Sequence, residues 1–151
     1  MQYVIFDIDG TIANNNHRYH YMTGEKKDRA GFLSKMAYDE PIQSVITLIQ
    51  IIFKSRSPLV FQIILVTGRS ERYRGVTQDW LEKYQVPYYK LLMRRDNDHR
   101  KDWDIKEEIL QTLIKQFGKK PVFVVDDRQQ VVDLWRRHDI ICLQPNVAIE
   151  F

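Results

Sequence analysis

Short apolar runs that end in acidic or small polar residues place the strongest constraint on the fold of this chain. Three such runs cover residues 4–6, 60–66 and 122–125. The first ends at Asp7 and Asp9, the second at Thr67, and the third at Asp126 and Asp127. Apolar runs without polar alternation are typical of parallel strands that are buried on both faces. Because ligands bind at the carboxyl ends of such strands, the pattern predicts both a sheet and a site on its edge.

Segments with helical spacing of apolar residues separate these strands. They cover residues 41–53, 70–84, 102–116 and 129–137, and two further strands are expected at 88–93 and 140–143. Ser57 and Pro58 are expected to end the first helix, Ser70 to cap the second, and Gly118 to end the third. Strands that alternate with helices predict an α/β fold with a doubly wound parallel sheet of about five strands and right-handed crossovers.

The length of 151 residues suits one domain, which we expect to cover residues 1–151. Residues 14–29 are polar and show no clear period, so they predict an irregular insertion, within a small cap over about residues 13–58. Lys and Arg number 23 against 20 acidic residues, which gives a net charge of +3. The excess of basic residues favours an anionic partner, but an ordinary solvated surface explains it equally well.

The cysteine content and the apolar segments favour a protein of the reducing cytoplasm. Cys142 is the single cysteine, so an intrachain disulfide and a multi-cysteine zinc site are excluded, and its apolar neighbours predict a buried side chain. Residues 1–3 are too few to hold a secretory signal before the first strand. Residues 41–53 are shorter than the ~20 residues of a membrane span, so we expect a core helix there.

The acids at the strand ends predict a metal site. Asp7, Asp9, Asp126 and Asp127 converge on one edge if their strands are neighbours, and four unpaired carboxylates repel one another there. A hard cation with oxygen ligands relieves this repulsion, and Mg²⁺ takes a few carboxylates while it keeps some waters. A pair of acids in a surface turn is the alternative for Asp7 and Asp9, but the buried-strand context disfavours it.

Four sequence motifs resemble those of the haloacid dehalogenase superfamily of phosphotransferases. They are DIDGT (7–11), VTGR (66–69), a later lysine and VVDDR (124–128). The resemblance covers nearly the whole chain and implies a Rossmann-like sheet with strand order 3-2-1-4-5. It also implies that Asp7 is a nucleophile that forms an aspartyl-phosphate. Asp9 would protonate the leaving oxygen and then activate water, a role that favours a phosphatase within the superfamily.

The same resemblance assigns roles to the remaining motif residues. It implies that Thr67 donates its hydroxyl to the transferred phosphoryl group and that Lys106 balances charge on it. Asp126 and Asp127, with Asp7 and the main-chain carbonyl of Asp9, would hold Mg²⁺.

Two longer segments resemble the phosphatase half of phage-type polynucleotide kinase-phosphatases, which removes terminal 3′-phosphates from DNA or RNA. They are RRDNDHRKDWDIKEEIL (94–110) and VVDDRQQVVDLWRR (124–137). Asp102 would brace Lys106 from one helical turn earlier, which favours Lys106 over Lys101 as the motif lysine. The substrate-binding residues implied by the resemblance are Gly68, Arg69, Arg94 and Arg128.

The function expected from these patterns is a Mg²⁺-dependent 3′-phosphatase that acts on phosphorylated nucleic-acid ends or nucleotides. The phosphate loop GxxxxGK[ST] of a kinase is not found in the sequence, so the resemblance implies the phosphatase activity alone, and a separate kinase or ligase is a possible partner. A small-molecule nucleotidase and a non-catalytic module that binds nucleic-acid ends are the alternatives. Aromatic side chains of the insertion could stack on nucleobases or pack on their own domain; they are His17, Tyr19, His20 and Tyr21.

Overall fold

The computed structural model describes residues 1–55 and 61–148, and its centre is a five-stranded parallel sheet. The strands lie in the order β5-β4-β1-β6-β7, which confirms the order 3-2-1-4-5 expected for the main strands. Their bounds are β1 (Gln2–Phe6), β4 (Phe61–Ser70), β5 (Lys90–Arg94), β6 (Val124–Val125) and β7 (Cys142–Leu143). We predicted that the first helix ends at residues 57 and 58 and that the second strand starts at residue 60. These three residues lie outside the described part of the chain.

Strand register brings the polar strand ends together at one edge of the sheet. Phe6 of β1 pairs with Leu65 of β4 on one side and with Val125 of β6 on the other. Both pairings are parallel, so the residues that follow these positions emerge at the same edge. Asp7, which follows Phe6, therefore lies between the polar ends of β4 and β6.

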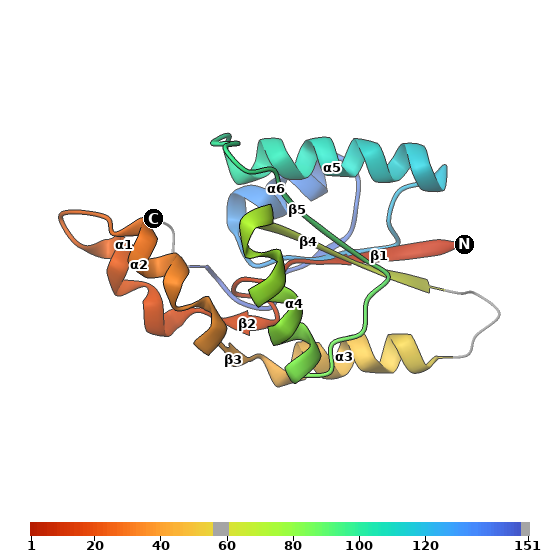
Figure 1. Ribbon diagram of the computed structural model, residues 1–151. Coiled ribbons are helices and arrows are strands. Elements are labelled where there is room, and N and C mark those ends of the chain that lie inside the picture. The colour runs from red at the N-terminus through yellow and green to blue at the C-terminus, as the bar shows by residue number, and fades with distance from the viewer. Residues whose placement is uncertain (56–60, 149–151) are drawn as a thin grey trace.

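Two pairs of helices cover the two faces of the sheet (Figure 1). They are α3 (Gln43–Lys54) with α4 (Arg74–Lys83), and α5 (Asp102–Phe117) with α6 (Gln129–Arg137). An apolar core lies on each face of the sheet, and alternate residues of β1 point into the two cores. Val4 and Phe6 belong to the first core, and Tyr3 and Ile5 belong to the second. Burial on both faces explains why β1 carries no polar alternation.

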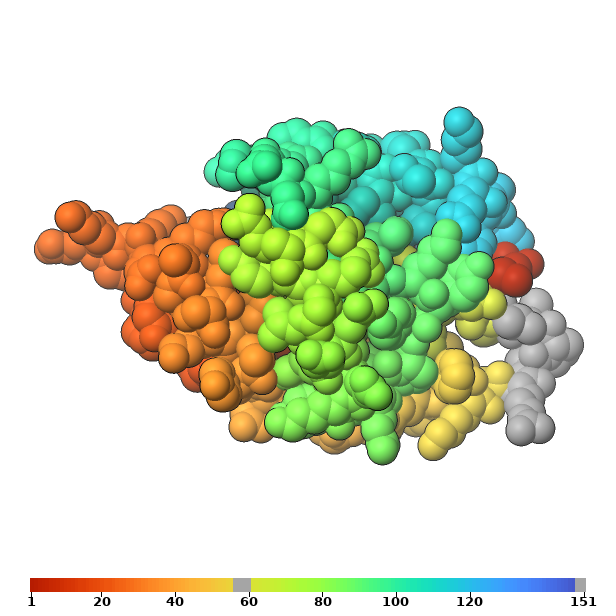
Figure 2. Space-filling model, viewed as in Figure 1, coloured from red at the N-terminus to blue at the C-terminus, as the bar shows by residue number. Residues whose placement is uncertain are grey.

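The insertion after β1 contains short helices and strands, which differs in part from the irregular structure expected for residues 14–29, although residues 24–28 have no regular structure. Its elements are β2 (Ala13–Asn14), η1 (Asn16–Arg18), α1 (His20–Thr23), α2 (Arg29–Ser34), η2 (Met36–Tyr38) and β3 (Glu40–Pro41). The antiparallel pair β2–β3 closes the insertion at its base, and Asp28 caps α2 by accepting from the amide of Gly31. In Figure 2 this segment forms a lobe at one end of the molecule, beyond the carboxyl ends of the strands seen in Figure 1.

Two helix starts differ from the sequence-based expectation. Ser70 makes no side-chain cap, because β4 continues to Ser70 past an irregular stretch and pairs there with Arg94. A short 3₁₀ turn, η3 (Glu71–Tyr73), then precedes α4. Pro41 lies in β3, so α3 begins at Gln43. Strand pairing at the base of the insertion therefore displaces the predicted helix start by two residues.

Cys142 is buried in the second core, as predicted, and burial raises the pKa of its thiol to about 12. None of the helices in the described part of the chain is long and apolar enough to cross a membrane.

Candidate active site

Asp7 and Lys106 form a buried ion pair at the carboxyl edge of the sheet. Lys106 reaches this edge from the second turn of α5, and its Nζ donates to Asp7 Oδ1 and to Asp126 Oδ2, each at 2.8 Å. Lys106 is 2 % exposed, Asp7 6 % and Asp126 1 %. Burial by itself would lower the pKa of Lys106, but the charges of Asp126 and Asp7 raise it, so the ammonium group stays protonated.

Neighbouring groups fix the orientation of these two carboxylates. Thr11 donates its hydroxyl to Asp7 Oδ2 at 3.3 Å, and the indole of Trp135 donates to Asp126 Oδ2 at 3.2 Å. Thr67 is fully buried at the end of the neighbouring strand, where its hydroxyl oxygen accepts from the amide of Arg69 at 3.2 Å. The side chains of Asp7 and Asp126 are therefore held rigidly, as a preorganised site requires.

Asp7, Asp126 and Asp127 form a carboxylate cluster whose charge suits a divalent cation. One ligand oxygen of each lies within 4.8 Å of the others. If all three carboxylates ionise, one ammonium group leaves two negative charges uncompensated. Burial and the neighbouring acids raise the pKa of Asp7 well above its usual value, although Lys106 opposes this, and burial and Asp126 raise that of Asp127 to about 7. Hard oxygen donors with excess negative charge fit Mg²⁺.

The Asp9 carboxylate lies outside this cluster, in a separate ion-pair network. Arg18 Nη2 donates to Asp9 Oδ1 at 2.8 Å, and Arg69 donates to the same oxygen from Nη2 at 2.7 Å. Burial by itself would raise the pKa of Asp9, but the charge and hydrogen bonds of Arg69 and then of Arg18 lower it to about 2. Asp9 is thus ionised here, and its side chain lies apart from the cluster of the other three acids. We expected all four carboxylates to converge, with the main-chain carbonyl of Asp9 as its metal ligand.

Asp39 completes this second network and joins the two ends of the insertion. Arg18 donates to both oxygens of Asp39, from Nε at 2.8 Å and from Nη2 at 2.7 Å, and Arg69 Nη2 lies 3.3 Å from Oδ2. His17 Nε2 lies 2.7 Å from Asp39 Oδ1, and the indole of Trp80 donates to the Asp39 carbonyl at 2.8 Å. Arg18 and Asp39 are each 1 % exposed. Sequence reasoning missed both residues, because no periodicity or spacing marks them in the polar insertion.

Arg94 and Asp102 are placed differently from their predicted roles. Arg94 is 6 % exposed, and its guanidinium donates to the carbonyls of Gly68, Asp98 and Arg100. It also donates to Asp102, so its contacts are those of a brace for the loop after β5.

The second Asp102 oxygen accepts from Arg128 Nη1 at 3.0 Å. No hydrogen bond joins Asp102 to Lys106 among the described residues, so the direct brace expected between them is wrong, although Asp102 still favours the charged lysine electrostatically. Asp102 instead orients Arg128, whose side chain is 32 % exposed beside the site.

Gly10 permits the close approach of Asp127 to the loop after β1. It has a φ of +79°, and a Cβ on it would lie 1.9 Å from Asp127 Oδ2.

We expect Gly10→Ala to lower the free energy of unfolding by about 1 to 3 kcal/mol and to impair turnover, because both the backbone and Asp127 must shift. Urea unfolding checks this, with Gly75→Ala as the control. A Cβ on Gly75 meets nothing within 4 Å, and alanine is favourable in the first turn of α4, so this variant should be no less stable than the wild type. Equal stabilities of the two variants would contradict the prediction.

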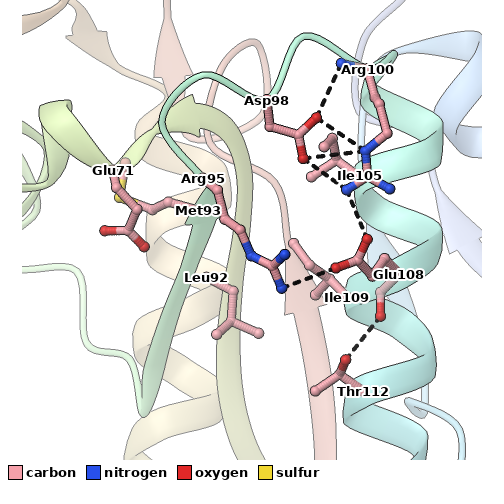
Figure 3. A pocket seen from close by; sticks show the side chains of 10 residues that line it. All are labelled: Glu71, Leu92, Met93, Arg95, Asp98, Arg100, Ile105, Glu108, Ile109 and Thr112. Carbon is pink, nitrogen blue, oxygen red and sulfur yellow. Dashed lines mark hydrogen bonds and ion pairs between the residues drawn. The ribbon is translucent and has the colours of Figure 1, made fainter.

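A hollow of about 200 Å³ lies between β5 and α5, and none of the strand-end acids of the site lines it (Figure 3). Leu92, Ile105 and Ile109 line its apolar part. Its charged rim is internally paired, since Arg95 and Arg100 both bind Glu108. These charged residues are thus already paired with one another.

The fold and the buried acids at the edge of its sheet identify the class of protein: a hydrolase of the haloacid dehalogenase superfamily. Within this class, the chain belongs to the family described as the polynucleotide kinase PNKP phosphatase domain, whose model matches residues 1–148. The chain is accordingly a phosphoric monoester hydrolase.

Several known proteins are similar to the chain. A protein of Autographa californica nuclear polyhedrosis virus, which has been assigned the name bifunctional polynucleotide kinase/RNA ligase, is 33% identical over 135 residues. The match covers 88% of this chain and 17% of the viral protein. The chain thus spans about a sixth of this relative.

Solved structures agree with this assignment. A chain in the structure of the Pnkp1/Rnl/Hen1 RNA repair complex superposes with a TM-score of 0.80 at 35% identity, over 99% of this chain and 43% of that one. A chain in a second structure of the Pnkp1/Rnl/Hen1 complex gives 0.79 at 34% identity, over 99% and 47%. A hydrolase from Streptococcus pneumoniae shares the fold alone, with a TM-score of 0.60 at 14% identity over 94% of this chain and 91% of that one.

Proposed function

We propose that the chain removes 3′-phosphates from polynucleotide ends through an aspartyl-phosphate on Asp7. The observation that carries the proposal is the pair of 2.8 Å hydrogen bonds that Lys106 makes to Asp7 and Asp126 at the edge of the sheet. Lys106 donates to one oxygen of Asp7 and Thr11 donates to the other. These two hydrogen bonds orient the carboxylate for attack on phosphorus. A carboxylate nucleophile divides ester hydrolysis into two easier displacements.

In the first displacement, Asp7 Oδ attacks phosphorus and the bond to the sugar 3′ oxygen breaks. The leaving oxygen takes a proton, and the phosphoryl group remains on Asp7. Lys106 and the hydroxyl of Thr67 stabilise charge on the phosphoryl oxygens. In the second displacement, water attacks phosphorus, gives up a proton, and restores the Asp7 carboxylate as inorganic phosphate leaves.

Asp9 is the proposed proton carrier in both displacements. Its lowered pKa of about 2 keeps the resting carboxylate ionised, which is the form that accepts a proton from water in the second displacement, but it also makes that carboxylate a weak base. Donation in the first displacement requires that Asp9 be protonated, and hence that contacts from Arg18 and Arg69 be released. The phosphate of an incoming substrate competes with Asp9 for these two guanidinium groups, because both are natural partners of phosphate oxygens. Substrate binding would thereby raise the pKa of Asp9 towards the value that donation needs.

Asp7, Asp126 and Asp127, with the Asp9 carbonyl, are the residues that would hold Mg²⁺ in this proposal. The ion would offset developing charge on the phosphoryl oxygens. We expect millimolar Mg²⁺ to raise the melting temperature of the resting protein, because it relieves repulsion among buried carboxylates. Asp127→Asn should melt higher than the wild type in a chelator, since one repelling charge is gone, and should lose most of the Mg²⁺ response. An equal Mg²⁺ response in both proteins would contradict this ligand set.

The substrate assignment is tested by a panel of phosphomonoesters with and without Mg²⁺. RNA and DNA oligonucleotides that carry a 3′-phosphate or a 5′-phosphate are compared with free nucleotides at several salt concentrations. We expect release from 3′-phosphorylated oligonucleotides to be fastest and to fall as salt rises, because basic side chains contact the backbone phosphates. A preference for free nucleotides without salt dependence would instead support a small-molecule nucleotidase. End binding without any turnover would support a binding module.

A ligase or kinase partner is part of this proposal. The similar chains occur in the Pnkp1/Rnl/Hen1 RNA repair complex and in a viral protein that bears the name bifunctional polynucleotide kinase/RNA ligase. A 3′-phosphate blocks ligation, so a phosphatase that exposes a 3′-hydroxyl prepares the substrate of a ligase. RNA ends are therefore the first substrates to assay.

A further inference from the structure

The three tryptophans of the chain differ in their surroundings. Trp80 and Trp135 are 3 % and 0 % exposed, and each donates its indole N–H to an oxygen of the site described above. Trp103 is partly exposed and belongs to neither apolar core. Within residues 1–55 and 61–148, its indole N–H has no hydrogen-bond partner. A large, partly exposed aromatic side chain that is outside the cores and makes no hydrogen bond is a candidate for contact with a ligand.

The position of Trp103 on α5 places it beside the active-site opening. It lies one helical turn before Lys106, whose Nζ reaches Asp7, and side chains three residues apart share a helix face. It also directly follows Asp102, which binds Arg128. Because α5 starts at the carboxyl edge of the sheet, Trp103 is one turn nearer to that edge than Lys106. Trp103 thus lies on the first turn of α5, near the edge of the sheet that carries Asp7.

Lys101 adds a positive charge to this aromatic surface. Its Nζ lies over the ring of Trp103, 5.9 Å from the centroid, and the residue is exposed. No acidic side chain forms an ion pair with Lys101 in the part of the chain that the structure describes. An aromatic face next to an unneutralised cation is the combination that binds single strands, since the face stacks on a base and the cation attracts the backbone phosphate.

We propose that Trp103 and Lys101 form a platform for the nucleotide that precedes the 3′-terminal one in a single-stranded substrate. The inference rests on the proposed function and adds the feature that separates a polynucleotide from a mononucleotide. With the terminal phosphate at Asp7, the preceding base stacks on Trp103 and its phosphate lies near Lys101. Stacking of this kind tolerates any base, so the platform selects for a second nucleotide without selecting a sequence.

The test measures the ratio of kcat/KM for a 3′-phosphorylated pentanucleotide to kcat/KM for the matching nucleoside 3′-monophosphate. In the wild type this ratio should be well above one. Trp103→Ala should lower it about tenfold, mainly through KM, as expected for the loss of one stacked base, and Trp103→Phe should retain most of it. Lys101→Ala should lower the ratio less and should weaken its dependence on salt. The matched control is Tyr89→Ala.

Tyr89 is 52 % exposed and has Lys90 Nζ 5.8 Å from its ring centroid, but it precedes β5 and so lies at the opposite edge of the sheet. The ratio for Tyr89→Ala should equal that of the wild type.

Each outcome bears on either the platform or the proposed function. A ratio in Trp103→Ala within twofold of the wild type would overturn the platform while the phosphatase proposal stands. A wild-type ratio near one would also overturn it. If the wild type releases no phosphate from any 3′-phosphorylated strand, the proposed function itself fails. Should Trp103→Ala not fold, Trp103→Phe and Lys101→Ala decide the question, and wild-type salt dependence in Lys101→Ala counts against the platform.

Discussion

Asp7→Asn should reduce phosphate release from a 3′-phosphorylated oligonucleotide by at least about 10⁴-fold. The amide is nearly isosteric with the carboxylate and can still accept from Lys106, but it is a poor nucleophile towards phosphorus. Lys106 keeps its second partner, Asp126, in the variant, so the fold should survive. Single-turnover assays measure the loss, and circular dichroism with thermal melting checks the fold.

Asp133→Asn is the matched control for this variant. Asp133 is an exposed acid on α6 that accepts from Gln129, so its replacement should leave turnover at the wild-type rate. Turnover by purified Asp7→Asn protein within tenfold of the wild type would remove Asp7 as the nucleophile.

Replacing Lys106 by methionine should damage both stability and turnover. It leaves Asp7 and Asp126 buried without their shared cation, which costs about 3 to 5 kcal/mol when one partner of a buried pair is removed. Turnover should fall by at least about 10²- to 10³-fold, because a preorganised charge near the phosphoryl group is lost. Urea unfolding in a chelator and steady-state assays measure the two effects separately.

The stability loss in Lys106→Met should depend on pH in a defined direction. Burial already raises the pKa of Asp7 in the folded protein, and Lys106 opposes this rise. Without the lysine, the folded pKa lies further above the unfolded one, so the folded state binds more protons and stability falls as pH increases between the two values. The deficit should therefore be larger at about pH 8 than at about pH 5.

Lys115→Met, at an exposed position of the same helix, should show neither the stability loss nor its pH dependence. A Lys106→Met protein as stable as this control would contradict the account of the buried pair.

The sheet was predictable because its strands are buried on both faces. Residues such as 4–6 and 63–66 have no polar position that could face water, and this pattern specifies a parallel strand almost by itself. The cluster of Asp7, Asp126 and Asp127 followed from strand order, since acids at neighbouring parallel strand ends must meet. The strand order itself came from the resemblance to a superfamily and not from the apolar pattern.

The parts that could not be predicted depend on long-range contacts between polar side chains. Arg18 and Asp39 are 21 positions apart, and nothing local distinguishes their charges from the solvated charges around them. Their burial also determines the contacts of Asp9. Its side chain pairs with Arg18 and Arg69 and points away from the other acids. Asp102 illustrates the same limit: its spacing from Lys106 suggests a helical pair, but Arg94 at the end of β5 and Arg128 before α6 occupy both of its oxygens.

Detection of phosphate on Asp7 is the measurement that tests the central claim most directly. The protein is mixed with an oligonucleotide that carries a radiolabelled 3′-phosphate, quenched in acid within the first turnover, digested, and its peptides are analysed by mass spectrometry. The account predicts an acid-stable phosphate on the Asp7 side chain that forms and decays at rates compatible with turnover. Full-rate phosphate release without any labelled protein, or with the label on another residue, would contradict it.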